Sequence, residues 1–384
     1  MPAISPDLLK SAEARLDDII ADIKTLVEVE SPSEDKDAVA EGAAVVADLM
    51  YERLDMEPEP VVVNDVTHLR LRVGELKPKV VLITHQDTVW PVGTVARKPF
   101  SNDGHALRGP GTFDMLTGLA MSIHAAKILK DQGHTLYGLS ILVTGDEELG
   151  STTSKELLLQ EAAEARAVFV MEGALDTSLK VARKGTSNYT VAVHGVASHA
   201  GLDPEKGINA GIALGLLMPE IAALGEPSLG TTVTPTVLKG GTTTNTVPDY
   251  AEVVVDARAT TIAEQERVDE QIRALTSPMT GARIEVTGGV NRPPMERSAA
   301  QTLFERAEKV AAAIGIDELT AAEVGGASDG NFTAAAGIPT LDGMGACGAG
   351  AHAEHEHALV DYIAPRTALL AGLIAAHLDR PAAG

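Results

Sequence analysis

The stretch K-V-V-L-I-T-H-Q-D-T, residues 79–88, joins a continuous apolar run to a polar tail. A β-branched run of this kind indicates a strand that is covered on both faces. Similar runs return at 140–144 and 167–171, and segments with helical spacing separate them near 116–131 and 152–164. This alternation predicts an α/β fold in which helices flank a sheet on both sides.

Acidic and histidine residues stand at the point where these apolar runs end. They are His85 after the first run, Glu147 and Glu148 after the second, and Glu172 after the third. In open α/β sheets, ligands bind beyond the carboxyl ends of the strands. The sequence therefore predicts a functional site at this edge of the sheet.

The residues before the first run predict three further elements. Apolar residues keep helical spacing from 9 to 27, and a second helix is predicted at 37–54. V-V-V at 61–63 and L-R-L-R-V at 69–73 have the character of two strands in a hairpin. The chain is thus expected to open with two helices and a hairpin before the buried sheet begins.

From about Lys184 the pattern changes to alternating strands and amphipathic helices. The predicted elements are strands at 189–193, 251–258 and 282–287 and helices at 208–224 and 262–275. Helical spacing like that of the first part resumes at 299–314 and 364–378. We therefore expect a small α+β domain, 185–295, inserted into a larger domain made of 1–184 and 296–384.

The composition excludes several classes of protein. A chain of 384 residues with 45% hydrophobic content can bury a large core, and its net charge of −23 argues against nucleic acid as a partner. Cys347 is the one cysteine, so any metal must bind to oxygen and nitrogen ligands. Residues 1–10 lack a basic region followed by an apolar core, and no apolar run reaches membrane-spanning length. We expect a cytoplasmic protein without a membrane partner.

Six short stretches carry side chains that can ligate divalent metals. They are T-H-Q-D-T (84–88), G-P-G-T-F-D (109–114), T-G-D-E-E-L-G (144–150), M-E-G (171–173), S-H-A-G (198–201) and G-A-H-A-E-H-E (350–356). Each is ordinary by itself; Asp114, for example, stands where a helix N-cap is common. Three adjacent carboxylates at 146–148 repel one another unless a cation is present. Together the stretches predict a metal site, although chemistry alone does not choose among His352, His355 and His357.

Two other patterns suggest different functions. G-M-G-A-C-G at 343–348 matches a dinucleotide-binding pattern, but a His/Glu run follows it instead of a phosphate-binding helix. G-A-S-D-G at 326–330 matches a nucleophile elbow, and Ser328, Asp342 and His352 follow in the order of a serine hydrolase. The serine-hydrolase hypothesis leaves the carboxylates of the upstream stretches without a role.

The six stretches, in this order, resemble those of the co-catalytic dinuclear zinc peptidase family. That family includes glutamate carboxypeptidases, acetylornithine deacetylase, succinyl-diaminopimelate desuccinylase and aminoacylases. The resemblance covers nearly the whole chain and is strongest to folate-cleaving glutamate carboxypeptidases, through T-H-Q-D-T-V, R-K-G-T-S, G-V-A-S-H-A-G and N-T-V-P. It implies a zinc-binding catalytic domain with a mixed central sheet flanked by helices, and an inserted α+β dimerisation domain.

The resemblance also implies a role for each residue of the site. His85 and Glu172 would bind one zinc, Glu148 and His352 a second, and Asp114 would bridge the two. Asp87 would orient His85, and Glu147 would be the general base that activates a zinc-bound water. His199 would act in the active site of a partner subunit, so a homodimer is expected. Substrate contacts are implied for Asn245, Arg258, Gly326 and Ser328.

The function expected from these residues is hydrolysis of C–N amide bonds. The reading we favour is a carboxypeptidase that releases a C-terminal amino acid such as glutamate from an N-acyl or peptide substrate. An aminoacylase or N-acyl-amino-acid deacetylase would use the same site. A non-catalytic metal-binding or assembly protein is a third reading, but such a protein has no need of Glu147. Two Zn²⁺ per chain are expected, with Co²⁺ or Mn²⁺ possible at ligands of this type.

Overall fold

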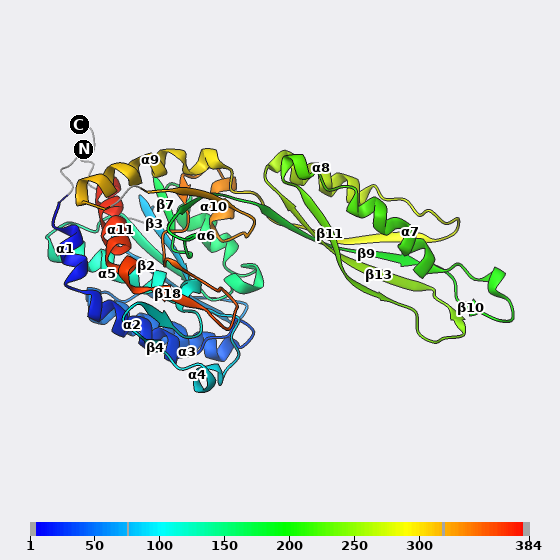
Figure 1. Cartoon of the computed structure of the whole chain (residues 1–384), viewed down its shortest axis with the longest axis horizontal. Helices are drawn as coiled ribbons and strands as arrows, with labels where there is room; N and C mark the ends of the chain where they lie inside the picture. The colour runs from blue at the N-terminus through cyan, green and yellow to red at the C-terminus, as the bar shows by residue number, and fades with distance from the viewer. Residues whose placement is uncertain (1–4, 75–76, 317–318, 379–384) are drawn as a thin grey trace. The chain divides into compact units, whose positions relative to one another are not determined.

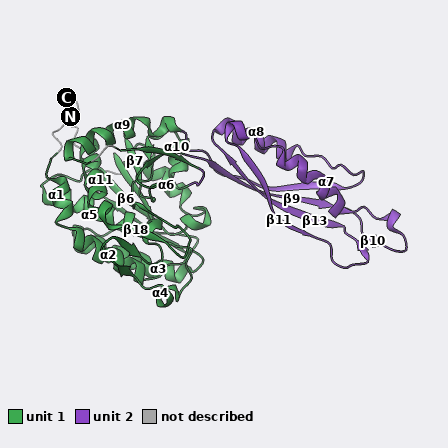
Figure 2. Ribbon diagram, viewed as in Figure 1, with its two compact units in different colours: residues 1–182, 297–324, 328–384 green, residues 183–296, 325–327 purple. Residues whose placement is uncertain are grey.

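A computed structural model describes residues 5–74, 77–316 and 319–378. The first four residues of the N-terminal stretch assessed above therefore lie outside the described residues. The chain forms two compact units (Figure 2), of which unit 1 comprises 1–182, 297–324 and 328–384 and unit 2 comprises 183–296 and 325–327. The boundaries expected from the sequence were 184/185 and 295/296.

Unit 1 is built on a six-stranded mixed sheet (Figure 1). Its strands, in spatial order, are β1 (Glu59–Val63), β2 (Val66–Arg72), β6 (Leu139–Thr144), β3 (Val80–His85), β7 (Ala167–Val170) and β16 (Thr340–Leu341). β3 pairs in parallel with both β6 and β7, whereas β1 with β2 and β2 with β6 pair antiparallel. The predicted mixed central sheet is therefore confirmed.

Helices cover the central strands of this sheet. The α-helices of unit 1 among the described residues are α1 (Leu8–Glu13), α2 (Leu16–Glu28), α3 (Lys36–Leu54), α4 (Thr94–Arg97), α5 (Thr117–Asp131), α6 (Lys155–Ala162), α9 (Arg297–Ile314), α10 (Gly330–Ala335) and α11 (Ile363–Leu378). Side chains of α6 and α10 form one cluster with Val81 and Ile83 of β3, and α5 and α11 also contact β3. Every residue of β3 is buried, as the apolar run predicts.

Unit 1 differs from the sequence expectation at its first helix and in its shortest strands. The helix expected over 9–27 is divided into α1 and α2 at Ala14 and Arg15. Apolar spacing continues across the break, so the pattern did not show it. Several strands of two to five residues were not predicted, because they lack the continuous apolar run that reveals β7. These are β4 (Ser101–Asn102), β5 (Ala106–Arg108), β8 (Leu179–Arg183), β15 (Ala321–Val324), β17 (Gly348–Ala349) and β18 (His357–Leu359).

Unit 2 has the predicted α+β character. Its sheet has the order β11 (Thr232–Gly240), β13 (Tyr250–Ala259), β9 (Gly185–His194) and β14 (Arg283–Arg292). Two helices, α7 (Ala210–Ala222) and α8 (Ile262–Arg273), bury their apolar sides against it. β11 was not predicted, because Pro235 interrupts its pattern and most of its side chains are exposed, which is typical of an edge strand. None of the helices in the described ranges is both long and apolar enough to cross a membrane.

Candidate metal centre

Three neighbouring strands of unit 1 deliver most of the predicted site. His85 is the last residue of β3, Glu172 stands two residues after β7, and the 3-10 turn η2 (Glu147–Leu149) follows β6 closely. Because β6, β3 and β7 are adjacent and parallel, their carboxyl ends meet at one edge of the sheet. The strand order thus explains why residues far apart in sequence converge here.

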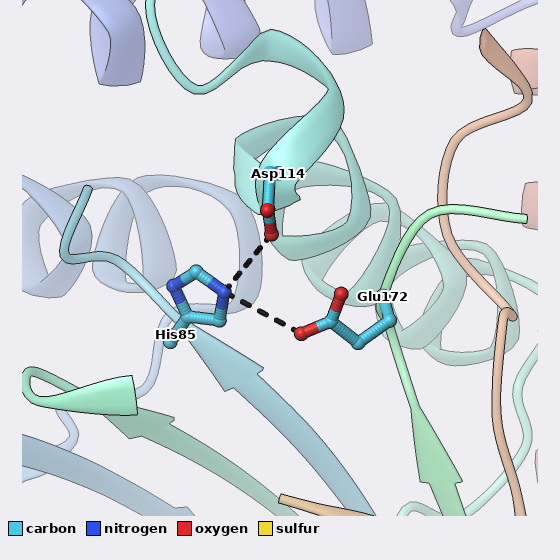
Figure 3. A group of neighbouring side chains, drawn as sticks. All are labelled: His85, Asp114 and Glu172. Carbon is cyan, nitrogen blue, oxygen red and sulfur yellow. Dashed lines mark ion pairs between the residues drawn. The ribbon is translucent and has the colours of Figure 1, made fainter. Parts of the chain in front are cut away.

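A first group of possible metal ligands consists of His85, Asp114 and Glu172 (Figure 3). Nε2 of His85 lies 3.3 Å from Oδ1 of Asp114 and 3.6 Å from Oε1 of Glu172. Figure 3 shows the imidazole turned toward both carboxylates. His85 comes from a strand end, Asp114 from the segment before α5 and Glu172 from the loop after β7.

A second group shares Asp114 with the first and adds Glu148 and His352. Nε2 of His352 lies 3.2 Å from Oδ2 of Asp114 and 3.0 Å from Glu148. Asp114 therefore turns one carboxylate oxygen toward each histidine. His355 belongs to neither group among the described residues, and the structure thus places His352 where a last ligand was expected.

The donor set fits two divalent cations. Within each group the possible ligand atoms all lie within 4.8 Å of one another. Nε2 of His85 is buried and makes no hydrogen bond within the described residues, which is costly unless another partner completes it. The donors are imidazole nitrogens and carboxylate oxygens, the ligands that zinc, cobalt and manganese accept.

Asp87 supports the site in a way that differs from the expected one. Nδ1 of His85 bonds to the backbone carbonyl of Asp87 at 2.9 Å, whereas the nearest carboxylate oxygen is 3.6 Å away. Because a carbonyl only accepts, Nδ1 carries a proton, and Nε2 is the ring nitrogen that can bind a metal once its own proton is released. The Asp87 carboxylate instead accepts the amides of Glu147 and Glu148 at 3.2 Å each, and Oγ of Ser33 at 2.6 Å.

A buried network also holds the chain just before Glu147. The amide of Gly145 donates to Nδ1 of His68 at 3.1 Å, and Nε2 of His68 lies 3.1 Å from Oγ1 of Thr153. Thr153 in turn donates to Asp146 at 2.8 Å. The sequence analysis missed His68, although it is a fully buried polar residue within an otherwise ordinary strand pattern.

Ser328 is not placed as a nucleophile or as a substrate contact. It is fully buried, and its hydroxyl donates to Oδ2 of Asp342 at 2.5 Å. Its backbone amide donates to Asn331 at 2.9 Å, so the residue closes a turn before α10. His352, the third member of the serine-hydrolase pattern, contacts Asp114 and Glu148 instead. We therefore assign Ser328 a structural role.

In unit 2, His199 and Asn245 lie side by side. The short strands β10 (Ser198–His199) and β12 (Thr246–Val247) pair antiparallel, and the amide of Ala200 donates to the carbonyl of Asn245 at 2.8 Å. Both residues are exposed. Nδ1 of His199 accepts the amides of Gly201 and Leu202 at 3.1 Å, which leaves Nε2 with the proton.

Arg258 and Gly326, also in unit 2, have partners of their own. Nε and Nη2 of Arg258 form a two-point contact with Asp256 at 2.9 and 2.8 Å. A substrate carboxylate would therefore have to use Nη1 or displace Asp256. Gly326 is exposed, and its carbonyl accepts a hydrogen bond of 3.1 Å from Nη1 of Arg183.

Metal binding is expected to release protons from both histidines. Burial opposes a charged His85, but the carboxylates of Asp114 and Glu172 raise its pKa well above the ordinary range. Contacts with Asp114 and Glu148 raise the pKa of His352 to about 10. A metal binds only the neutral imidazole, so at pH 7.5 zinc should displace about one proton per histidine. Affinity should then rise as the pH increases from 6 to 9.

Calorimetric titration of the metal-free protein with zinc in buffers of different ionisation enthalpy measures this release. His352→Ala should release about one proton fewer than the unaltered protein, because one of the two protonated imidazoles is gone. A binding enthalpy that does not depend on the buffer would contradict the prediction.

Two ligand groups that share one carboxylate are the arrangement that two-metal hydrolases use. The chain belongs to peptidase family M20/M25/M40, whose sequence profile matches residues 81–376. It is therefore an enzyme of the metallopeptidase class.

Individual relatives agree with this assignment. Carboxypeptidase G2 from Pseudomonas sp. strain RS-16 is 28% identical over 380 residues, covering 93% of this chain and 88% of that protein. Succinyl-diaminopimelate desuccinylase from Gluconobacter oxydans is 31% identical over 142 residues, covering 34% and 37%. The fold resembles that of the Bacillus subtilis YXEP protein, described as a dinuclear metal-binding M20 peptidase. The TM-score is 0.66 at 16% identity, over 96% of this chain and 99% of that one.

Proposed function

We propose that this protein is a dinuclear zinc hydrolase that releases a C-terminal amino acid, such as glutamate, from N-acyl or peptide substrates in the cytoplasm. The observation that carries the proposal is Asp114, which faces both His85 and His352 and so joins two ligand groups into one centre. Similarity to carboxypeptidase G2 over almost the whole chain supports the choice of a carboxypeptidase.

The residues of the chain divide the work of amide hydrolysis. Divalent cations bound here would supply electrophilic stabilisation of the carbonyl oxygen and would lower the pKa of water. Glu147 is 9% exposed and belongs to the same short turn as the ligand Glu148. In our proposal its carboxylate takes a proton from the attacking water and returns it to the leaving amine nitrogen. The two amides bonded to Asp87 keep this turn in place.

We propose that His199 acts across a homodimer. Its Nε2–H is free of the local bonds that occupy Nδ1, and it can donate to a developing oxyanion. Asn245 lies beside it, beyond the Tyr250 end of β13. Arg258 lies eight residues after Tyr250 on β13, and the rise of a strand places it about 26 Å from that end. If Asn245 and Arg258 touch one small substrate, they must come from different chains.

An exposed apolar surface of unit 2 suits such a dimer. Ile212 and Leu216, four residues apart on α7, are 56% and 57% exposed. Leu238 of the edge strand β11 is 56% exposed and lies on the face of the sheet that α7 covers, and α7 contacts β11. An edge strand offers backbone donors and acceptors to a second copy of itself. We call Ile212, Leu216 and Leu238 the α7–β11 surface and propose that it forms the homodimer interface.

A mixing experiment tests the action of His199 in trans. His199→Ala and Glu147→Gln are each expected to be inactive alone. In a mixed dimer, one site combines an intact Glu147 with the partner's intact His199. After subunit exchange, activity should return to about a quarter of that of the unaltered protein, since half the dimers are mixed and each has one intact site.

The same mixture, prepared from variants that are expected not to dimerise, provides the control. Ile212→Glu and Leu216→Glu together place charges on the α7–β11 surface and should yield monomers in sedimentation analysis. Introduced into both partners, they should abolish the recovery, whereas Val62→Glu, an exposed apolar position of unit 1, should not. No recovery from mixed dimers shown to have formed would mean that His199 acts within its own chain or not at all.

An aminoacylase or deacylase function is the second candidate. It is favoured by the similarity to a succinyl-diaminopimelate desuccinylase, although that match covers about a third of the chain. A panel of folyl-glutamate, peptides and N-acyl amino acids, assayed with metal analysis of the same sample, separates the two candidates. Release of C-terminal glutamate supports the carboxypeptidase, and preference for simple N-acyl groups supports the deacylase. If the zinc-loaded protein cleaves none of them, the proposed function fails and a binding role gains support.

A further inference from the structure

Glu356 is a buried carboxylate beside the metal centre that the reaction does not use. It lies four residues after His352 and is 2% exposed. Four N–H groups converge on it. Oε1 accepts the amides of Phe113 and Asp114 at 3.0 and 3.1 Å. Oε2 accepts the amide of Gly111 at 3.0 Å and the indole Nε1 of Trp90 at 2.9 Å.

These contacts join two of the three segments that supply the second ligand group, those of Asp114 and His352. Three of the donors belong to the segment that ends at Asp114, and the acceptor belongs to the loop that carries His352. Both segments contain left-handed backbone, with φ of 73° at Gly111 and 61° at His352. A non-glycine residue held in this region costs free energy and persists only when its surroundings fix it. The buried carboxylate of Glu356 bonds directly to the backbone of one segment from the other and can fix both.

We propose that Glu356 is a positioning residue that sets Asp114 and His352 at the separation required by a metal, and that Trp90 reports this arrangement. The proposal rests on the proposed function for the identity of the ligands. It assigns Glu356 neither contact with substrate nor contact with metal.

The four N–H groups that surround Glu356, which we call the Glu356 cradle, require a carboxylate as their acceptor. A glutamine offers only one acceptor oxygen, so it can serve either the pair Phe113 and Asp114 or the pair Gly111 and Trp90. The other pair would face an amide NH₂ group, which donates and does not accept. In either orientation Glu356→Gln breaks the link between the two segments at a buried position, while the volume of the side chain stays the same.

Trp90 provides a signal that is specific to this cradle. It is the one tryptophan of the chain, so its fluorescence arises from a single environment. Its indole N–H is bonded to Glu356, and Nζ of Lys98 lies 4.0 Å from the centre of its ring. A shift of the Glu356 carboxylate as the ligands close on a metal would alter the indole hydrogen bond and its emission.

The test is a zinc titration of the metal-free full-length protein, followed by both Trp90 fluorescence and calorimetry. In the unaltered protein, emission should change as the second metal binds. Glu356→Gln should weaken that binding step about 10- to 100-fold, as the loss of a residue that hydrogen-bonds to a metal ligand typically does. Glu354→Gln is the matched control for the calorimetric affinity, because Glu354 lies on the same loop, is exposed and pairs only with Lys98 at 3.5 Å among the described contacts.

Two results would overturn the proposal. One is an unchanged affinity for both zinc ions in folded Glu356→Gln, which would leave the proposed function intact. The other is measured in the unaltered protein and does not depend on the folding of a variant: two zinc ions bind, but Trp90 emission does not respond. A protein that binds zinc with the expected Trp90 response yet cleaves no amide would instead refute the proposed function alone.

Discussion

Glu147→Gln should reduce amide hydrolysis by at least about 10²- to 10⁴-fold, the contribution expected of a general base. The amide group cannot accept a proton from water at neutral pH. The residue is not a member of either ligand group, and its backbone amide still reaches Asp87 in the variant. Zinc content measured by mass spectrometry should therefore stay near two ions per chain.

Glu148→Gln is the matched comparison for this variant. It makes the same chemical change one residue further along the turn, but at a residue of the Asp114–Glu148–His352 group. It should lower the zinc content toward one ion per chain, with activity falling as a consequence. Turnover at the normal rate by Glu147→Gln would refute the assigned mechanism, and a joint loss of metal would show that Glu147 is itself a ligand.

The sequence predicts best those parts of the site that depend on buried strands. His85 and Glu172 could be placed because each ends a continuous apolar run, and such runs are covered on both faces and lie in the middle of a sheet. The prediction that they meet required only that parallel neighbours end at the same edge.

The supports of the site could not be read from local patterns. Ser33, His68 and Glu356 act through contacts with residues 54, 77 and more than 240 positions away. Nothing in the sequence near each of them indicates which distant loop will come within reach. Asp87 shows a related limit, since its carboxylate was expected on His85 but bonds to the turn that carries Glu147.

The ion pair between Asp256 and Arg258 in unit 2 was missed for a different reason. Asp256 and Arg258 are two residues apart on β13, so their side chains lie on the same face of the sheet. Their ion pair, at 2.8 Å, could have been foreseen from the strand period alone. It implies that an anionic substrate group would compete with Asp256 for the guanidinium.

Asp114→Asn should have the largest effect on metal content, because Asp114 is the one residue common to both ligand groups. The substitution removes a negative charge and one of the two oxygens that face His85 and His352. Loss of a residue that only hydrogen-bonds to a metal ligand lowers metal affinity about 10- to 100-fold. Loss of a ligand shared by both metals should lower the affinity of both positions by more than this. Zinc content after dialysis should fall from about two ions per chain to less than one, with hydrolysis lost in parallel.

Variants that alter only one ligand group test whether the loss of both zinc ions is specific to the shared residue. Glu172→Gln and Glu148→Gln each alter one group, so each should retain one zinc ion more firmly than Asp114→Asn does. Asp65→Asn is a control for the substitution itself, because the Asp65 side chain is 91% exposed, pairs with Lys36 and belongs to neither ligand group. Should Asp114→Asn keep two zinc ions through dialysis, the two positions would have to bind independently, and the shared carboxylate would not be the link between them.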